Sequence, residues 1–174
     1  QTSFYVKHSV FNITSDLENE IAKKRYVELA GFALMPNHFH LILHESKEGG
    51  ISKYMQRVLN SYTKYFNTKY EKIGHLFQGP YKAVQIKDNE QFLYLSTYIH
   101  RNPREIKEWK NREENYPWSS YQDYIKESRW GNILVNDIIC NQFSTKSKYH
   151  DFVTTSPAKT KDILDKDLMI DALL

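Results

Sequence analysis

Two short β-prone runs separated by a Pro-Asn break constrain the fold of this chain more than any other feature. The run "YVELAGFALM" ends at Met35, and "HFHLILHE" begins at His38, with Pro36 and Asn37 between them. Aliphatic and aromatic residues dominate both runs, while proline and asparagine favour a turn over a continued strand. The sequence therefore predicts two adjacent strands, and the second carries a pair of histidines, His38 and His40.

Further strands and helices are expected around this pair. "FYVKHSVFNI" predicts an earlier strand, and "YKAVQI" predicts a later one over residues 81–86. Capping signals and apolar residues at three- and four-residue spacing predict the helices. These helices are expected over residues 15–25 and 51–66, in "DNEQFLYLSTYIHRN", from "PWSSYQDYI" onward, and within residues 132–153.

This order of elements predicts an α+β fold. We expect a ferredoxin-like or RRM-like antiparallel sheet, with helices packed mainly on one face and additional C-terminal helices. The 174 residues suit one folded domain over residues 1–130, followed by a helical extension over residues 131–174. The polar stretch over residues 154–166 is expected to be mobile.

Composition narrows the class of protein only slightly. Hydrophobic residues make up 40% and charged residues 26% of the chain, and no apolar run approaches the length of a membrane span. The single cysteine, Cys140, cannot form an internal disulfide, which fits a reducing cytoplasm. A net charge of +3 mildly favours nucleic acid as a partner, although an ordinary soluble surface explains the charge equally well. An aromatic content of 14% suits single-stranded nucleic acid, although most aromatic side chains pack in cores.

The histidine pair has the spacing of a metal site. Alternate residues of a strand project to the same side, so the Cβ atoms of His38 and His40 are expected about 7 Å apart. Two imidazoles at that separation can converge on one ion. The alternatives are histidines on a solvent-facing strand, or one histidine satisfied by a buried hydrogen bond.

The predicted helix around "YLSTYIHRNP" offers a nucleophile and a third ligand. Tyr98 and Asn102 are four residues apart and therefore share a helix face. An amide oxygen suits Mg²⁺ or Mn²⁺ better than a structural zinc. Two structural explanations compete: Asn102 can cap a new helix that begins at Pro103, and Tyr98 can be a core tyrosine.

Five ordered motifs give the chain a resemblance to a known family. They are "GFALMPNHFHLIL", "YMQRVLNSYTKYFN", "GHLFQGPYKAV", "YLSTYIHRNP" and "YPWSSYQDY", within roughly residues 26–126. In these motifs the sequence resembles the IS200-like Y1 transposases, and among them the REP-associated tyrosine transposases. Two features depart from the pattern: the first strand and helix are shorter than the family's, and Pro80 stands where many relatives have arginine.

The resemblance implies a metal-dependent single-strand DNA endonuclease and strand transferase of the histidine–hydrophobic–histidine (HUH) class. It matches His38 and His40 to the metal-binding pair, Tyr98 to the nucleophile and Asn102 to the third ligand of a divalent ion, Mg²⁺ or Mn²⁺. It implies a catalytic domain over residues 1–130 that acts on hairpin-forming DNA through a 5′-phosphotyrosine during transposition. It also implies a bacterial, cytoplasmic, nucleoid-associated protein, monomeric or homodimeric, with no membrane partner.

The DNA contacts and the choice between related functions stay open. Basic residues on the predicted helices and turns are the candidate DNA contacts: Lys53, Arg57, Lys64, Lys82, Arg101 and Arg104. Each has an ordinary solvated charge as its alternative. Two other functions remain: a domesticated DNA- or RNA-binding protein that no longer transposes, and a rolling-circle initiator or relaxase with the same site.

Overall fold

The computed structural model describes residues 15–158 and 172–173. In this part of the chain, β1 (Val27–Leu34) and β2 (His38–Glu45) form the predicted antiparallel pair. The two-residue strand β3 (Ala172–Leu173) pairs with the other edge of β2, at its beginning. The strand expected from "FYVKHSVFNI" and the tail expected to be mobile lie largely outside the described residues.

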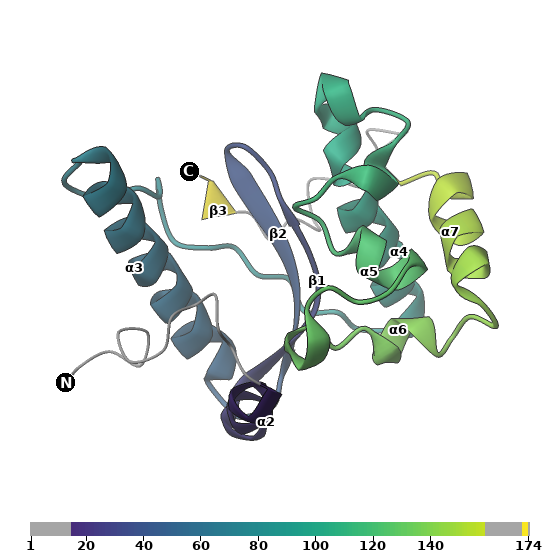
Figure 1. Cartoon of the computed structure of the whole chain (residues 1–174), viewed down its shortest axis with the longest axis horizontal. Helices are drawn as coiled ribbons and strands as arrows, with labels where there is room; N and C mark the ends of the chain where they lie inside the picture. Colours follow the sequence, from purple (N-terminus) through teal and green to yellow (C-terminus); the bar gives the residue numbers. More distant parts are fainter. Residues whose placement is uncertain (1–14, 159–171, 174) are drawn as a thin grey trace.

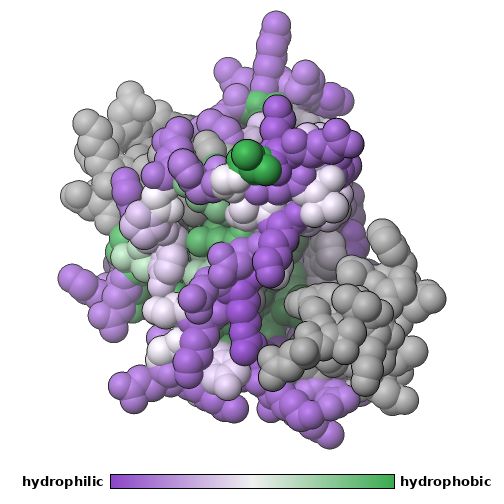
Figure 2. Space-filling view, turned by 90° about the vertical axis from the view of Figure 1, so that its left-hand side faces the viewer, coloured by the Kyte–Doolittle hydropathy of each residue, from purple (hydrophilic) through white to green (hydrophobic). Residues whose placement is uncertain are grey.

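Helices cover both faces of this sheet. Helix α3 (Gly50–Tyr70) lies along one face, and α4 (Asn89–Arg101) leads a layer of helices on the other (Figure 1). Seen from the α3 side, hydrophilic side chains cover most of the described surface and hydrophobic ones gather in the hollows between them (Figure 2). The α+β class is confirmed, with the helices divided more evenly between the two faces than the sequence suggested.

The register of the hairpin decides which side chains meet each helical layer. Phe32 lies opposite Leu41, and Ala33 lies opposite His40, so neighbouring pairs point to opposite faces of the sheet. The register shifts between Leu29 and Gly31, where β1 contains a bulge. The pairs Phe32–Leu41 and Ala33–His40 therefore contribute to the core on opposite faces of the sheet.

Two adjacent glycines connect β2 to α3. Gly49 has a φ of 69°, a left-handed conformation that glycine adopts without steric cost. A Cβ on Gly50 would lie 2.5 Å from the backbone oxygen of Tyr26, so this position has no room for a side chain. The carboxylate of Glu45 accepts a 2.7 Å hydrogen bond from the amide of Gly50 and so satisfies a free N–H at the start of α3.

The predicted helices are present, with small differences at their ends. The amide of Gln91 donates to the side chain of Asp88, which caps α4 as its sequence predicts. The remaining helical elements are α2 (Ser15–Lys24), η1 (Asn102–Glu105), η2 (Lys107–Trp109), η3 (Glu113–Asn115), α5 (Tyr121–Ile125), η4 (Gly131–Ile133), α6 (Asp137–Cys140) and α7 (Lys146–Thr155). Both α6 and α7 fall within the stretch of residues 132–153 that was expected to be helical, apart from the last two residues of α7.

The strand predicted over residues 81–86 is wrong. These residues have no regular secondary structure, although they run past β2. A cavity of about 840 Å³ separates the two segments, and residues of both line it. A strand needs a neighbouring strand to which its backbone can hydrogen-bond. Residues 81–86 face the cavity on this side, so the segment remains irregular.

Candidate functional site

The hairpin brings the two histidines together as the strand spacing predicts. The ring centroids of His38 and His40 are 4.9 Å apart, and the ring planes cross at 79°. His40 is buried, with 2% of its surface exposed, while His38 at the beginning of the strand is half-buried. The Nδ1 atom of His38 lies 2.7 Å from the Oδ1 atom of Asn37, which orients this ring.

Helix α4 places Tyr98 against this pair. The ring centroids of His40 and Tyr98 are 5.6 Å apart, in an edge-to-face arrangement at 83°. Tyr98 is 2% exposed and belongs to the hydrophobic core, so the competing interpretation of a core tyrosine describes its surroundings correctly. The ring of Tyr98 therefore lies directly beside His40.

Asn102 is completely buried, one helical turn beyond Tyr98. It is the C-cap of α4, with a helical backbone at φ −54° and ψ −40°. Four residues of helix correspond to a rise of about 6 Å, which keeps Asn102 and Tyr98 on one face. Neither atom of its amide group has a hydrogen-bond partner among the described residues, so the alternative role as a capping side chain is not realised.

These side chains suit a divalent ion. A buried amide without a partner costs about 1–3 kcal/mol, a cost that a ligand at its oxygen would offset. Imidazole nitrogens with an amide oxygen form a donor set that Mg²⁺ or Mn²⁺ accepts. Within residues 15–158 and 172–173, no group of three His, Cys, Asp or Glu side chains could hold a metal ion, and the candidate set combines His38 and His40 with the amide of Asn102.

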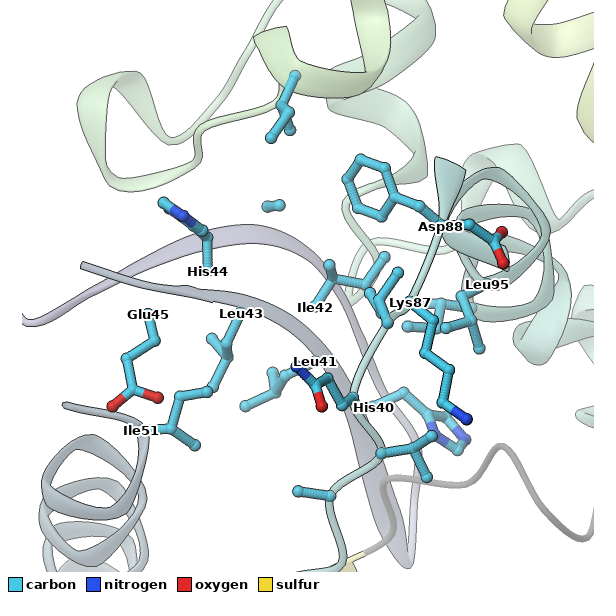
Figure 3. A pocket seen from close by; sticks show the side chains of 18 of the residues that line it. His40, Leu41, Ile42, Leu43, His44, Glu45, Ile51, Lys87, Asp88 and Leu95 are labelled. Atoms are coloured by element: carbon cyan, nitrogen blue, oxygen red, sulfur yellow. The ribbon is translucent and has the colours of Figure 1, made fainter. Parts of the chain in front are cut away.

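The cavity beside β2 gives His40 an open side. Figure 3 shows His40 among the side chains of β2 that line it, with Lys87 and Asp88 from the segment before α4. Apolar residues of α3 and α4, including Ile51 and Leu95, form much of the remaining wall. His40 is therefore buried in the sheet but borders a space larger than its own ring.

The histidine of α4, His100, has a different role from the pair on β2. It points about 200° around the helix from Tyr98, toward α5 and α7. Its Nδ1 lies 2.7 Å from the hydroxyl of Tyr149, and its Nε2 lies 2.8 Å from the hydroxyl of Ser120. Ser120 donates its one proton to the carbonyl of Phe32, so Nε2 of His100 is the donor and Nδ1 the acceptor.

Burial keeps His100 neutral. Desolvation of the charged form lowers its pKa from 6.5 to about 3. With both ring nitrogens bonded inside the core, His100 cannot exchange protons with a substrate, in agreement with leaving it unassigned on sequence grounds.

The six candidate DNA contacts fall into two groups. Those on α3 and in the segment after it are exposed: Lys53, Arg57, Lys64 and Lys82. Lys53 and Arg57 lie over the ring of Tyr26, at 5.2 Å and 5.9 Å from its centroid. Lys47 joins them at 5.1 Å, a neighbour that the sequence pattern missed because it lies in a loop.

The other two candidates are engaged inside the protein. Arg101 is 8% exposed, and its guanidinium donates to the backbone carbonyls of Val153 and Ser156 at the end of α7. Arg104 pairs with Glu113 at 3.5 Å, and both side chains are largely buried. Arg101 is the last residue of α4 and Arg104 lies in η1, so both flank Asn102 as the sequence placed them, and both guanidinium groups contact other parts of the protein.

The α+β fold agrees with the comparison to known families. The class is that of the transposases: the family model described as "Transposase IS200 like" matches residues 4–102, which is more than half of the chain. The chain belongs to the IS200-like transposase family. The matched segment includes His38, His40, Tyr98 and Asn102. No curated protein and no solved structure matches the chain.

Family membership identifies DNA as the partner and transposition as the general activity. None of the helices within residues 15–158 is long and apolar enough to cross a membrane.

Proposed function

We propose that this protein is a metal-dependent single-strand DNA endonuclease and strand transferase that acts on hairpin-forming DNA through a 5′-phosphotyrosine intermediate. The observation that carries the proposal is the contact between Tyr98 on α4 and His40 on β2, at 5.6 Å between ring centroids. A nucleophile and a metal ligand from distant parts of the sequence meet there, and Asn102 follows one turn later on the same helix.

In the proposed reaction the Oη atom of Tyr98 attacks the scissile phosphorus. The Tyr98 hydroxyl gives up its proton as the P–O bond to tyrosine forms, the P–O3′ bond breaks, and the departing 3′ oxygen takes up a proton, so the numbers of protons lost and gained are equal. A divalent ion held by His38, His40 and Asn102 would neutralise charge on the phosphate oxygens. Because the phosphotyrosine conserves the energy of the phosphodiester, a free 3′-hydroxyl can later reverse the step and join the strand elsewhere.

The burial of Tyr98 means that the protein must change conformation before this reaction can occur. Tyr98 is 2% exposed, so its hydroxyl must be uncovered before a phosphodiester can reach it. His38, which is half-buried, is the more accessible member of the histidine pair. We therefore expect hairpin binding to precede exposure of Tyr98, and cleavage to be slower than binding.

The experiment is incubation of the protein with a labelled single-stranded hairpin and Mn²⁺, followed by a denaturing gel. We expect a covalent protein–DNA adduct that EDTA prevents and that ordinary duplex DNA does not form. Tyr98→Phe should lose the adduct, and the matched control Tyr94→Phe, one turn earlier on α4, should retain it. Mass spectrometry that locates the phosphotyrosine at another position would overturn the assignment of Tyr98.

The burial of Tyr98 also favours a second candidate function. A domesticated protein that binds DNA or RNA hairpins without cutting them needs no accessible nucleophile. In that case the hairpin binds tightly, but wild type and Tyr98→Phe both lack an adduct in Mg²⁺ and in Mn²⁺.

A further inference from the structure

The fifth motif of the sequence, "YPWSSYQDY", covers the outer edge of β1. Three hydroxyl groups of this motif, four residues apart in the chain, donate to carbonyl groups of β1: Tyr116 to Leu34, Ser120 to Phe32 and Tyr124 to Ala30. Alternate carbonyl groups of a strand point to the same edge, and β1 is the first strand of the described sheet. The motif thus binds the edge of β1 that β2 leaves free.

Ser120 also connects this edge to α4. Its hydroxyl accepts hydrogen bonds from the amide of Phe32 and from Nε2 of His100, both at 2.8 Å, and donates to the carbonyl of Phe32 at 3.1 Å. The other ring nitrogen of His100 lies 2.7 Å from the hydroxyl of Tyr149, which holds the ring in place. Ser120 and His100 are both buried, so water does not compete for these bonds.

The hydrogen bonds of Ser120 end close to the candidate site on both elements. On the sheet, Phe32 precedes Ala33, the cross-strand partner of His40. On α4, the histidine bound to Ser120 lies two residues after Tyr98, within the same helical turn. A shift of α4 along or away from β1 would therefore break this bond and change the distance between Tyr98 and His40.

The contact between Tyr98 and His40 does not set that distance by itself. Edge-to-face contacts between rings are favourable over centroid separations of roughly 4.5–7 Å, and the observed separation of 5.6 Å lies within this range. A hydrogen bond from N–H to oxygen is more demanding, because it weakens outside about 2.7–3.2 Å and away from linear geometry. The bond between His100 and Ser120 is thus the more precise constraint on α4.

We propose that Ser120 is a positioning residue that holds α4, through His100, at the place where Tyr98 meets His40. The inference rests on the proposed function in taking Tyr98 as the nucleophile. Ser120 is completely buried on the far side of α4 from this site, so it acts only through the helix. Misplacement of a reacting group by about 1 Å costs on the order of 100-fold in rate, which gives this bond a measurable effect on cleavage.

The first test measures the ring contact by NMR, without DNA or metal. Protein with isotope-labelled histidine and tyrosine rings should show nuclear Overhauser effects between ring protons of His40 and Tyr98. Ser120→Ala removes the hydroxyl that binds Nε2 of His100. Because the effect falls with the inverse sixth power of distance, we expect these cross-peaks to weaken several-fold in this variant.

The second test separates the rate of cleavage from affinity for DNA. At saturating labelled hairpin and Mn²⁺, Ser120→Ala should form the covalent adduct on the order of 100-fold more slowly than wild type. Its affinity for the hairpin should stay within about twofold of wild type, because phosphate contacts on the surface supply most of that affinity. Both proteins are assayed well below their melting temperatures, where loss of stability alone changes neither value.

Two further variants control for general damage. Tyr116→Phe also removes one hydroxyl that the motif donates to β1, but the ring of Tyr116 packs against Trp109. It should keep the cross-peaks and the rate of wild type. Ser120→Cys is close to serine in size, and its thiol is a weak hydrogen-bond partner, so its cross-peaks and rate should lie between those of wild type and Ser120→Ala.

Three results would overturn the inference. In the first, both serine variants keep the cross-peaks of wild type, and in the second, Tyr116→Phe loses them as Ser120→Ala does. In the third, Ser120→Ala loses the cross-peaks but forms the adduct at the rate of wild type. The proposed function fails separately: if wild type forms no adduct, the NMR comparison still shows whether Ser120 sets the contact between Tyr98 and His40.

Discussion

Two buried histidine–tyrosine clusters lie on opposite sides of α4 and differ in their hydrogen bonding. On the sheet side, Tyr98 contacts His40, and the nearby amide of Asn102 has no partner among the described residues. On the helical side, both nitrogens of His100 are bonded, one of them to Tyr149. Polar groups that satisfy one another stabilise a core, whereas a buried group without a partner costs stability and leaves an atom to which a ligand can bind.

The largest effect we expect separates these clusters by stability. His100→Ala removes a fully buried side chain and two hydrogen bonds, so it should lower the free energy of unfolding by about 3–5 kcal/mol. Tyr98→Phe removes one hydroxyl on the other side of the helix and should change it by no more than about 1 kcal/mol. Urea unfolding at neutral pH measures both values. Equal losses in the two variants would contradict the division into a structural and a functional cluster.

Acid should weaken the His100 cluster specifically. Its pKa is lowered to about 3 by burial, whereas the unfolded chain takes up the proton near pH 6.5. The contribution of His100 is therefore fully present above pH 6.5 and is lost as the pH falls toward 3, by about 1.4 kcal/mol per pH unit.

The matched variant is His100→Gln, which cannot titrate. The stability difference between wild type and His100→Gln should shrink by about 2 kcal/mol between about pH 7.5 and about pH 5. Parallel pH dependences for the two proteins would show that His100 is not the group responsible.

The sequence predicted the sheet side of α4 better than the helical side. Alternation along β2 and four-residue spacing along α4 are local patterns, so they placed His38 and His40, and Tyr98 and Asn102, on shared faces. The network of His100 needs Ser120 and Tyr149, which the chain brings together only when α5 and α7 pack on α4. Such long-range contacts leave no periodic signal in one sequence.

Exposure was the other property that sequence could not supply. Arginine is a residue type typical of DNA contacts, but Arg101 lies under the end of α7. Tryptophan is typical of cores, but Trp118 is 57% exposed. Residues 81–86 have the composition of a strand but lie across a cavity from β2. In each case, the packing of distant segments overrides a local preference.

Metal binding should increase the difference in stability between wild type and a variant of Asn102. Without metal, Asn102→Leu loses no hydrogen bond to the described residues, so its unfolding free energy should stay equal or rise by about 1 kcal/mol. With Mn²⁺, the melting temperature of wild type should rise with the metal concentration, because the ion binds only the folded state. Asn102→Leu should show no such rise.

Histidines of β2 provide the controls for this measurement. His40→Ala should also lose the response to Mn²⁺, while His44→Ala should retain it, because His44 is exposed and lies 3.1 Å from Glu28 instead. Loss of the response in His44→Ala would place the ion elsewhere on the strand.

The smallest expected effects distinguish surface arginines from buried ones in DNA binding. Arg57 is exposed beside Lys53 over Tyr26, whereas the guanidinium of Arg101 is occupied by carbonyls of Val153 and Ser156. Arg57→Ala should weaken hairpin binding a few-fold and reduce the slope of log affinity against log salt by about 1, the value for one lost phosphate contact. Arg101→Ala should lower thermal stability but leave the salt slope unchanged, since an interior guanidinium releases no counterion when DNA binds. Anisotropy titrations at several salt concentrations, at a temperature where both variants are folded, measure the slopes. A reduced slope for Arg101→Ala would mean that the end of α7 moves aside when DNA binds and frees this arginine for the phosphate backbone.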